Sequence, residues 1–441
     1  MNHTLPEAFL KDMQRLLGDE YPAFLCALDA PSALALRLNP KRKDAEAEAA
    51  PYIDEPVPWC AEGRYLAPLG EGRPGTAIAH ACGAFYLQEA SAMASAAVLA
   101  AEPGERVLDL CAAPGGKSTQ IAAALDDRGL LVSNDPEPAR AKALAGNLER
   151  MGAANAVVTC ALPRKLADRW GEYFDAVLVD APCSGEGMFR RDPAARDEWN
   201  PASPEGCARR QAEILDQAAR MLRPGGRLVY STCTFNEYEN EGSVLSFLAR
   251  HPDFFPEDFQ LPGVGASNRG MLRLFPHRLR GDGHFVAKLR RTGEGPAAET
   301  ASSVRIDRDL CAALEQDICR LPDFIADMKP FRQGDWLYAR PRICPALDGL
   351  RVISPGLCLV RLGRNHIEPA HALAMAIDPS CARRRVDLDD GAAHAWLRGE
   401  AVPCRGEKGW TLALHRSMPL GWGKVSDGML KNHLPKGLRR C

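Results

Sequence analysis

Several features that would place a protein in a membrane or outside the cell are missing from this 441-residue sequence. Its most apolar stretch of small residues, 90–101, falls short of the about 20 residues that a bilayer-spanning helix needs. Pro6, Glu7 and Lys11 stand where a signal peptide has its apolar core. We therefore expect a cytoplasmic protein that does not bind a membrane.

Metal-ligand spacing is also missing. No Cys-x-x-Cys pair occurs among the 15 cysteines, and Cys358, His366, His371 and Cys381 lack the spacing of zinc ligands. Cysteines scattered over a chain of this length indicate reduced thiols in a reducing compartment rather than a disulfide scaffold. The sequence predicts no metal site.

An excess of one charge is missing too, since 55 Lys and Arg residues face 57 Asp and Glu residues. The two signs are unevenly distributed, however. Residues 301–441 hold 22 basic and 16 acidic side chains, whereas residues 1–300 hold 33 and 41. A mildly basic end on an acidic body indicates an anionic partner.

Short apolar runs alternate with helical stretches in the middle of the chain. The runs that we expect to be strands are 106–110, 129–133, 156–159, 174–180 and 227–232, and the expected helices are 118–125, 136–151, 204–222 and 238–249. Gly281-Asp-Gly283 predicts a hairpin between 272–279 and 284–289. Repeated strand–helix units predict an α/β fold with a mainly parallel, doubly wound sheet, whose ligands bind beyond the carboxyl ends of the strands.

Composition divides the chain into four parts. Residues 1–75 begin with an amphipathic helical pattern and continue with a proline-rich stretch, which predicts a small N-terminal module. Residues 76–291 hold the strand–helix alternation. The small polar stretch 292–304 predicts a linker, and 305–441 mixes short apolar runs with glycines, as in a compact β-rich module.

The first strand runs into a glycine turn, Asp109-Leu-Cys-Ala-Ala-Pro-Gly-Gly-Lys-Ser118. Glycines here let the backbone approach a ligand and aim the N–H groups of the following helix at it. A phosphate loop would need glycine where Cys111 stands, so nucleoside triphosphate chemistry is a minor alternative. A nucleoside cofactor would need an acid after the second strand to accept ribose hydroxyls, and Asp135 is there.

Two further strand ends carry reactive side chains. The fourth strand ends in Asp180-Ala-Pro-Cys183, and the fifth in Ser231-Thr-Cys233. If these strands are neighbours, both thiols lie on one rim of the sheet beside a carboxylate. A thiolate is the reactive form of cysteine, so such a site must favour it through positive charge or helix dipoles.

At these three blocks the sequence resembles the Sun-domain RNA cytosine-5 methyltransferases, in particular the bacterial branch that acts on 16S ribosomal RNA. The similarity extends to Tyr86–Met93, Gly281–Ala287, Pro419–Lys424 and Leu430–Arg439. The resemblance implies a Rossmann-like methyltransferase core over 76–291, S-adenosyl-L-methionine as cofactor, RNA as partner and a PUA-like domain over 305–441.

The resemblance also implies catalytic roles. Cys233 is the thiol that attacks carbon 6 of cytosine, which makes carbon 5 nucleophilic toward the cofactor's methyl group. Asp180 hydrogen-bonds or protonates nitrogen 3 of the ring, Cys183 assists product release, and Lys117 supports the base or the site. DNA cytosine methyltransferases attack with the thiol of a Pro-Cys pair, as at Pro182-Cys183, so the opposite assignment is an alternative.

The cofactor is expected along the first loop and at two acids. The residues concerned are Cys111, Ala112, Ala113, Pro114, Gly115, Gly116, Lys117, Asp135 and Asp180. Many relatives carry an acid after the third strand, but 158–162 reads Val-Thr-Cys-Ala-Leu, so no contact is assigned there. A cytosine flipped out of its stack or single-stranded is expected as the target.

Basic side chains are the candidate RNA contacts. Those near the C-terminus are Lys424, Lys431, Lys436, Arg439 and Arg440, and further candidates are Arg37, Lys41, Arg42, Lys43, Arg190 and Arg191. We expect a monomer that methylates ribosomal RNA and does not act on DNA. The alternatives are transfer RNA methylation, a small-molecule methyltransferase, and an inactive ribosome assembly factor, against which the paired thiols argue.

Overall fold

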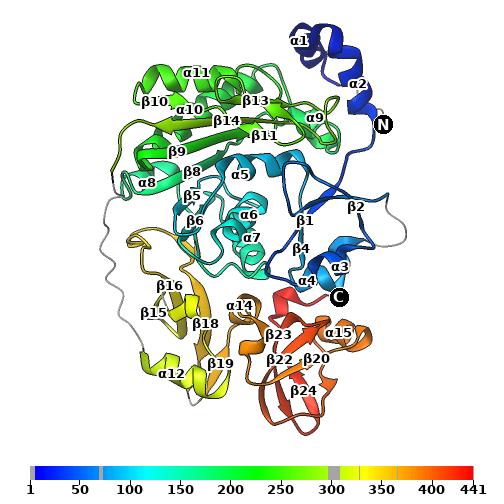
Figure 1. The fold of residues 1–441 in the computed structure, drawn as a ribbon, viewed down its shortest axis with the longest axis vertical. Coiled ribbons are helices and arrows are strands. Elements are labelled where there is room, and N and C mark those ends of the chain that lie inside the picture. The colour runs from blue at the N-terminus through cyan, green and yellow to red at the C-terminus, as the bar shows by residue number, and fades with distance from the viewer. Residues whose placement is uncertain (1–4, 69–72, 296–307, 327, 365, 441) are drawn as a thin grey trace.

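The computed structural model describes residues 5–68, 73–295, 308–326, 328–364 and 366–440 (Figure 1). The helices α1 (Glu7–Leu17) and α2 (Tyr21–Asp29) lie at one end of the long axis and the C-terminal sheets at the other, with the large central sheet between them. In the described part of the chain, no helix combines the length and the apolarity that a membrane span requires.

The central sheet has the strand order β10-β14-β9-β8-β5-β6-β7-β17, and β13 also pairs with β14. Its main strands are β5 (Arg106–Asp109), β6 (Leu130–Asn134), β7 (Ala156–Thr159), β8 (Phe174–Asp180), β9 (Leu222–Thr232), β13 (Met271–Leu274) and β14 (His284–Arg291). All pairs among β5 to β9 are parallel. The five expected parallel strands are therefore confirmed, and so is the β13–β14 hairpin, whose first strand is shorter than expected.

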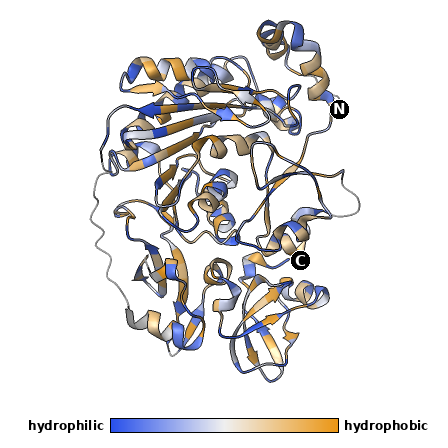
Figure 2. Cartoon of the chain, in the orientation of Figure 1, coloured by the Kyte–Doolittle hydropathy of each residue, from blue (hydrophilic) through white to orange (hydrophobic). Residues whose placement is uncertain are grey.

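Helices cover both faces of this sheet. Neighbouring strand residues point to opposite faces, so Val107 packs with Ile121 and Leu144 on one face, whereas Leu108 packs with Leu215 and Phe247 on the other. The first face carries α5 (Ala94–Leu99), α6 (Gly116–Leu125) and α7 (Pro138–Arg150), and the second carries α8 (Pro163–Ala167), α10 (Ser203–Met221) and α11 (Glu241–Arg250). The doubly wound arrangement is confirmed, and Figure 2 shows apolar colour concentrated along its strands.

The N-terminal part forms the α1–α2 pair and a small sheet. The sheet order is β2-β3-β1-β4, with strands Ile53–Pro56, Gly63–Leu66, Ala35–Leu38 and Phe85–Leu87. Two short helices, α3 (Ala45–Ala49) and α4 (Ile78–Ala81), lie beside it (Figure 1). The helix expected at the start of the chain is confirmed as α1, which buries Phe9, Met13 and Leu17.

Three of the candidate RNA contacts in this part are wrong, because their charges hold the fold together. Arg37 is 1% exposed and donates to Thr119 Oγ1 at 2.6 Å, and Arg42 is 6% exposed and donates to two backbone carbonyls. Lys41 binds Asp127 and the carbonyl of Gly152. Arg37 and Arg42 are buried, and the ammonium group of Lys41 is held by Asp127, so these cations already serve partners within the chain.

The C-terminal part contains two sheets. The first has the order β15-β16-β18-β19 (Met328–Gln333, Trp336–Pro341, Leu357–Leu362, Ile367–Pro369), and the second has the order β20-β22-β23-β24-β21 (Arg385–Asp387, Gly409–His415, Met418–Ser426, Met429–Asn432, Val402–Pro403). The helices here are α12 (Arg308–Asp317), α13 (Asp323–Ala326), α14 (His371–Ala376) and α15 (Asp390–Leu397). β17 (Val352–Ser354) instead pairs with β7 at the edge of the central sheet. The domain bounds stay a prediction, and most of the expected linker lies outside the described residues.

Candidate active site

The loops after β8 and β9 meet at the carboxyl edge of the central sheet. Asp180 and Ser231 are direct partners in the β8–β9 ladder, so the loops that follow them leave the sheet side by side. The two thiols come together as a result, with 3.4 Å between Cys183 Sγ and Cys233 Sγ, and both are partly exposed. The expectation that both cysteines share one rim is confirmed by this geometry.

A lysine from the first loop completes the cluster. Lys117 Nζ lies 2.8 Å from Asp180 Oδ2, and Ser231 Oγ donates to Oδ1 at 2.8 Å. His284 Nε2, from β14, lies 3.6 Å from the same Oδ1. The three sequence blocks thus converge on one carboxylate.

The charges of this cluster stabilise each other. Burial acts to raise the pKa of Asp180, but the Lys117 ammonium and the nearby His284 ring outweigh it and hold the pKa below its usual value. Burial acts to lower the pKa of Lys117, and the Asp180 carboxylate outweighs it, so this pKa is raised. Asp180 is therefore an anion and Lys117 a cation beside the thiols at neutral pH.

The two thiols differ in their surroundings. The hydrogen bond with Cys233, followed by burial, raises the pKa of Cys183 well above its ordinary value. Cys183 therefore keeps its proton and can donate it toward the neighbouring sulfur. Lys117 belongs to the same cluster as Cys233, and a cation in such a cluster favours a thiolate.

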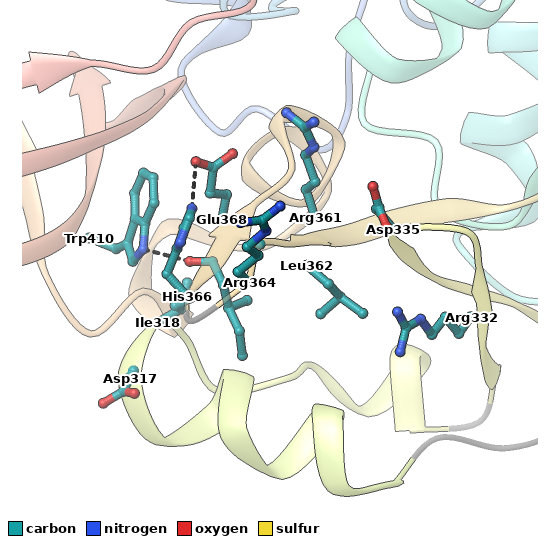
Figure 3. Close-up of a pocket in the computed structure, with 12 residues that line it drawn as sticks. Asp317, Ile318, Arg332, Asp335, Arg361, Leu362, Arg364, His366, Glu368 and Trp410 are labelled. Atoms are coloured by element: carbon teal, nitrogen blue, oxygen red, sulfur yellow. Dashed lines mark hydrogen bonds and ion pairs between the residues drawn. The ribbon is translucent and has the colours of Figure 1, made fainter.

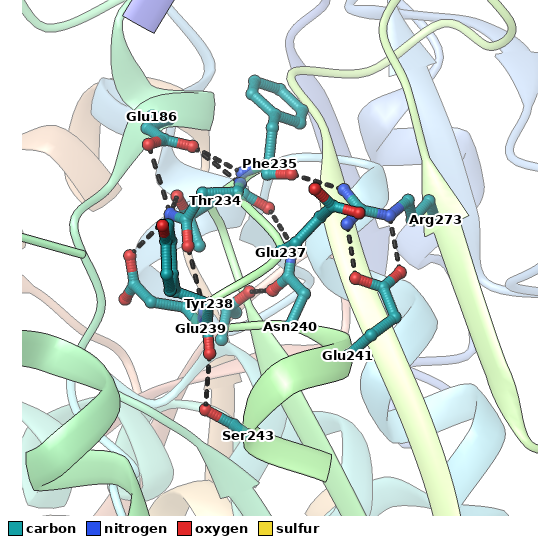
Figure 4. Close-up of polar contacts among 12 residues, drawn as sticks. Glu186, Thr234, Phe235, Glu237, Tyr238, Glu239, Asn240, Glu241, Ser243 and Arg273 are labelled. Carbon is teal, nitrogen blue, oxygen red and sulfur yellow. Dashed lines mark hydrogen bonds and ion pairs between the residues drawn. The ribbon is translucent and has the colours of Figure 1, made fainter. Parts of the chain in front are cut away.

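Two buried glutamates lock the two cysteine loops together (Figure 4). Glu186, after Cys183, accepts hydrogen bonds from the backbone N–H groups of Phe235 and Asn236 at 2.8 and 2.9 Å. Glu239, after Cys233, accepts from the backbone N–H of Ser184 at 3.0 Å. Each loop thus supplies the acceptor that the other loop needs, and neither can shift alone.

The sequence analysis missed both glutamates. The sequence did hint at them, because Glu186 follows Cys183 by three residues and Glu239 follows Cys233 by six. Both lie in short polar stretches that contain glycine or asparagine. Gly187 shows how close the loops come, since its N–H donates to the Cys233 carbonyl at 2.8 Å and a Cβ there would lie 2.8 Å from that oxygen. A side chain at this position would push the loops apart.

The α1–α2 pair packs on the same two loops. Phe24 meets Phe235 edge-to-face at 5.3 Å between ring centroids, and Phe9 meets Phe189 at 5.1 Å. These aromatic side chains belong to a separate buried cluster, to which strands β5 to β9 contribute no residue among those described. The apolar support of the cysteine loops therefore comes from the N-terminal helices and not from the sheet.

The expected cofactor loop has the geometry of a cradle. Gly115 adopts φ +115°, which favours glycine, and it precedes α6, whose N-terminal backbone N–H groups face the loop. The loop is held from α7, because Arg140 donates to the Ala113 carbonyl at 3.0 Å and Asn147 to the Pro114 carbonyl at 2.9 Å. Ala112 donates to the Asn134 carbonyl at 2.8 Å.

Two carboxyl groups flank this loop. Asp135 is buried, accepts from the Glu137 N–H at 3.0 Å and lies 3.3 Å from Arg140, so its role toward a ribose stays a prediction. Asp109 was not among the expected site residues. Its Oδ1 is buried without a hydrogen-bond partner among the described residues, Oδ2 accepts from Ser118, and burial raises its pKa to about 7. An acid directly before a glycine turn was the signal for it.

A large cavity lies far from the thiols, in the C-terminal part (Figure 3). Its volume is about 1150 Å³, and its lining includes Arg332, Arg361, Arg364 and Trp410. The basic C-terminal end is only partly free. Arg440 donates to the Thr76 and Ala77 carbonyls and Arg439 to the Leu434 carbonyl, whereas Lys424, Lys431 and Lys436 are exposed.

Metal-binding clusters and disulfide bonds are two further features to consider in the described residues. No group of three or more His, Cys, Asp and Glu side chains that could hold a metal ion occurs among them. The cysteines that the structure describes are free thiols.

Family models match nearly the whole chain. The model of the 16S rRNA methyltransferase RsmB/F family matches residues 96–290. Models of the N-terminal domain of 16S rRNA methyltransferase RsmF, of the RsmF rRNA methyltransferase first C-terminal domain and of the methyltransferase RsmF PUA domain match residues 5–90, 315–377 and 383–440.

Whole proteins match over the same length. Ribosomal RNA small subunit methyltransferase F of Erwinia tasmaniensis is 32% identical, and the match covers 100% of this chain and 98% of the relative. The protein of the same name from Shigella dysenteriae serotype 1 is 33% identical over 99% of this chain and 98% of its own.

Solved structures confirm the fold. A methyltransferase homolog protein from Pyrococcus horikoshii is 26% identical with a TM-score of 0.57, covering 66% of this chain and 96% of its own. NSun6 from Pyrococcus horikoshii, solved with SFG, is 24% identical with a TM-score of 0.58, covering 66% and 99%.

Proposed function

We propose, from the premise that this chain belongs to the RsmF family of 16S rRNA methyltransferases, that it methylates carbon 5 of a cytosine in 16S ribosomal RNA through a covalent cysteine adduct. The chain is an S-adenosylmethionine-dependent methyltransferase with a Rossmann-like core and a C-terminal PUA domain, and RNA is its partner. The observation that supports the cytosine chemistry is the pair of thiols, 3.4 Å apart, beside an ion-paired aspartate.

Two thiols at one site suit a reaction in which a covalent bond must form and later break. Carbon 5 of cytosine is a poor nucleophile, and a thiolate that adds to carbon 6 turns the ring into an enamine. We assign this attack to Cys233, because Lys117 is near enough to stabilise its charge and Cys183 holds its own proton firmly. Cys183 then assists release: solvent water takes the carbon 5 proton, the carbon 6–sulfur bond breaks with its electrons returning to Cys233, and the Cys183 thiol donates a hydrogen bond to the departing Cys233 thiolate.

Asp180 and Lys117 act on the polar edge of the base. Addition at carbon 6 places negative charge on the ring, and a hydrogen-bond donor at nitrogen 3 stabilises it. We assign this contact to the Asp180 carboxyl group, which is oriented by Lys117 and Ser231 at 2.8 Å each. Because Asp180 is an anion before the reaction, the proton that it passes to nitrogen 3 comes from the Lys117 ammonium, which gives a proton to Asp180 Oδ2 as the ring takes one. Lys117 is then neutral and Asp180 again a carboxylate, and the proton returns to Lys117 when the covalent adduct breaks down.

The first loop and its neighbours fit the cofactor. SFG is an analogue of S-adenosylmethionine, and S-adenosylmethionine, when bound, supplies an electrophilic methyl group. Residues 111–117 would line it, Asp135 would face its ribose, and the unpartnered Asp109 Oδ1 suits its ammonium group. These residues bind and orient, whereas the reacting thiols come from the loops after β8 and β9.

The assignment of the thiols is tested by trapping the adduct. Cys183→Ala, Cys233→Ala and the control Cys26→Ala, which alters an exposed cysteine of α2, are incubated with 16S rRNA and S-adenosylmethionine and run on a denaturing gel. We expect Cys183→Ala to accumulate a protein–RNA adduct, Cys233→Ala to form none, and Cys26→Ala to turn over like the wild type. An adduct with Cys233→Ala and none with Cys183→Ala would reverse the two roles.

The substrate is tested in cells. Bisulfite sequencing of ribosomal and transfer RNA from a strain that lacks the gene should show one or more 16S rRNA cytosines that lose their methyl group. Loss confined to transfer RNA would contradict the proposal. We further propose that the protein works as a monomer in the cytoplasm, where ribosomal subunits assemble.

A further inference from the structure

The large C-terminal cavity carries exposed cations that form no ion pair with a described residue, although Arg332 Nε donates to the Gly334 carbonyl at 2.9 Å. Arg332, Arg361 and Arg364 are exposed, and none lies within 4.0 Å of a carboxylate oxygen among the described residues. Exposed arginines elsewhere pair readily, as Arg398 does with Glu400 at 2.6 Å and Arg416 with Glu48 at 3.0 Å. Three guanidinium groups that no carboxylate of the described residues neutralises surround one hollow, which indicates an anionic ligand.

The cavity spans the two C-terminal sheets. Figure 3 shows Trp410, from β22, at one end and Arg332, from β15, at the other, with Arg361 and Arg364 between them. We call this hollow the Arg361 cleft, lined by Asp317, Arg332, Asp335, Arg361, Arg364, His366, Glu368 and Trp410. Of its acids, Glu368 is paired with His366 at 3.2 Å. The arginines of the cleft suit the phosphates of a nucleic acid, and its carboxylates suit the amino groups of the bases.

An aromatic face is available beside the arginines. Trp336 is 38% exposed and pairs with Arg361 across the β16–β18 ladder, and the Arg361 guanidinium lies 5.7 Å from its ring centroid. Lys424 Nζ lies 5.6 Å from the Trp410 ring in the same way. Trp410 is buried, so Trp336 is the exposed ring of the two. An exposed aromatic ring next to a cation is the usual means of stacking a base of a single strand while holding its phosphates.

The cleft continues toward the methyltransferase core. A second hollow of about 640 Å³ shares Arg361 and Trp410 with it and reaches Lys142 and Glu149 of α7. The same helix holds the cofactor loop through Arg140 and Asn147. A strand lying in the cleft would thus run from the C-terminal sheets to the helix that supports the cofactor loop.

We propose that the Arg361 cleft and the hollow that adjoins it bind a single-stranded segment of the substrate RNA, with phosphates on Arg332, Arg361 and Arg364 in the cleft and a base on Trp336 in the adjoining hollow. This inference rests on the proposed function and adds its RNA-holding site. It moves the main RNA contact from the basic C-terminal end, where Arg439 and Arg440 bind backbone carbonyls of this chain, to a cleft between two sheets.

Affinity for RNA at several salt concentrations tests the proposal. The triple variant Arg332→Ala/Arg361→Ala/Arg364→Ala is compared with Arg128→Ala/Arg220→Ala/Arg398→Ala, which removes three exposed arginines that are ion-paired outside the cleft. The probe is protein-free 16S rRNA, read by filter binding. We expect the cleft variant to bind at least tenfold more weakly and its slope of log K against log salt to fall by about 2, since a single strand contributes about 0.7 per phosphate. The control triple should bind like the wild type.

Trp336→Ala separates stacking from charge. We expect it to weaken binding about tenfold with the salt slope unchanged, because stacking releases no counterions. Equal binding by both triples would overturn the proposal. So would normal RNA binding together with weaker binding to small-subunit particles, which would assign the cleft to a ribosomal protein. If the wild type binds RNA but methylates none, the proposed function fails instead, whatever the cleft variants do.

Discussion

Replacing Phe24 tests whether the N-terminal helices hold the cysteine loops in place. The ring is fully buried, and it packs edge-to-face on Phe235 and Phe275 at 5.3 and 6.2 Å. Truncating a buried phenylalanine to alanine costs about 3–5 kcal/mol, to which each aromatic pair contributes about 0.5–1.5 kcal/mol. Because Phe235 follows Cys233 by two residues, we expect the loss to act directly on the loop that carries Cys233.

The assay separates stability from positioning. For Phe24→Ala we expect a free energy of unfolding lower by about 3–5 kcal/mol in urea. The single-turnover methylation rate should fall at least tenfold, measured well below the unfolding temperature with saturating cofactor and RNA. The Kd for S-adenosylhomocysteine should change less than twofold, because the aromatic cluster includes no residue of the cofactor loop.

Two variants serve as controls. Phe24→Leu keeps most of the apolar volume and should retain most of the rate. Phe331→Ala removes a buried ring stacked on Tyr338 in the C-terminal sheet, so it should cost stability without slowing methyl transfer. The reasoning is refuted if Phe24→Ala is destabilised as expected and yet transfers methyl groups at the wild-type rate.

Two further predictions concern the loops themselves. Gly187→Ala should lower the methylation rate at least tenfold, because the new Cβ would lie 2.8 Å from the Cys233 carbonyl oxygen. The control Gly206→Ala, which has open space around it in α10, should keep the methylation rate and raise the free energy of unfolding by about 0.5–1 kcal/mol. Methylation assays and urea unfolding check both variants. Burial raises the pKa of Asp109 to about 7. Between about pH 4 and 7 the folded protein therefore binds more protons at this group than the unfolded chain does. The contribution of Asp109 to the free energy of unfolding falls as the pH rises through that range. Asp109→Asn should remove that decline, and unfolding curves of wild type and variant that run parallel from pH 4 to 8 would contradict it.

The core of the fold could be predicted because its signals are local. Each of the five strands is a short apolar run, and the order of the sheet follows from the packing of successive strand–helix units. The three loops could be predicted for the same reason, since Lys117, Asp180, Cys183 and Cys233 each follow a recognisable strand end. Their meeting around one carboxylate required β8 to have both β5 and β9 as neighbours.

Features that depend on distant partners could not be predicted. Nothing in the sequence distinguishes Arg37 and Arg42 from exposed arginines. Their partners, Thr119 and a distant backbone carbonyl, are brought to them only by the folding of the chain. Glu186 and Glu239 likewise look like surface acids until the opposite loop presents its N–H groups. The sequence gives the charge of a side chain, but the partner that it binds lies tens or hundreds of residues away and cannot be predicted from the sequence alone.

The short strand β17 has a consequence for how this enzyme can be dissected. It extends the central sheet beyond β7, and neighbouring residues Cys344 and Leu347 complete the apolar layer under that edge. A chain cut before the C-terminal part would lose this cover and expose an open strand edge, which invites self-association. The methyltransferase core and the proposed RNA-binding cleft therefore cannot be studied as separate fragments. A truncated chain would aggregate, whereas single substitutions would measure the effect on RNA binding.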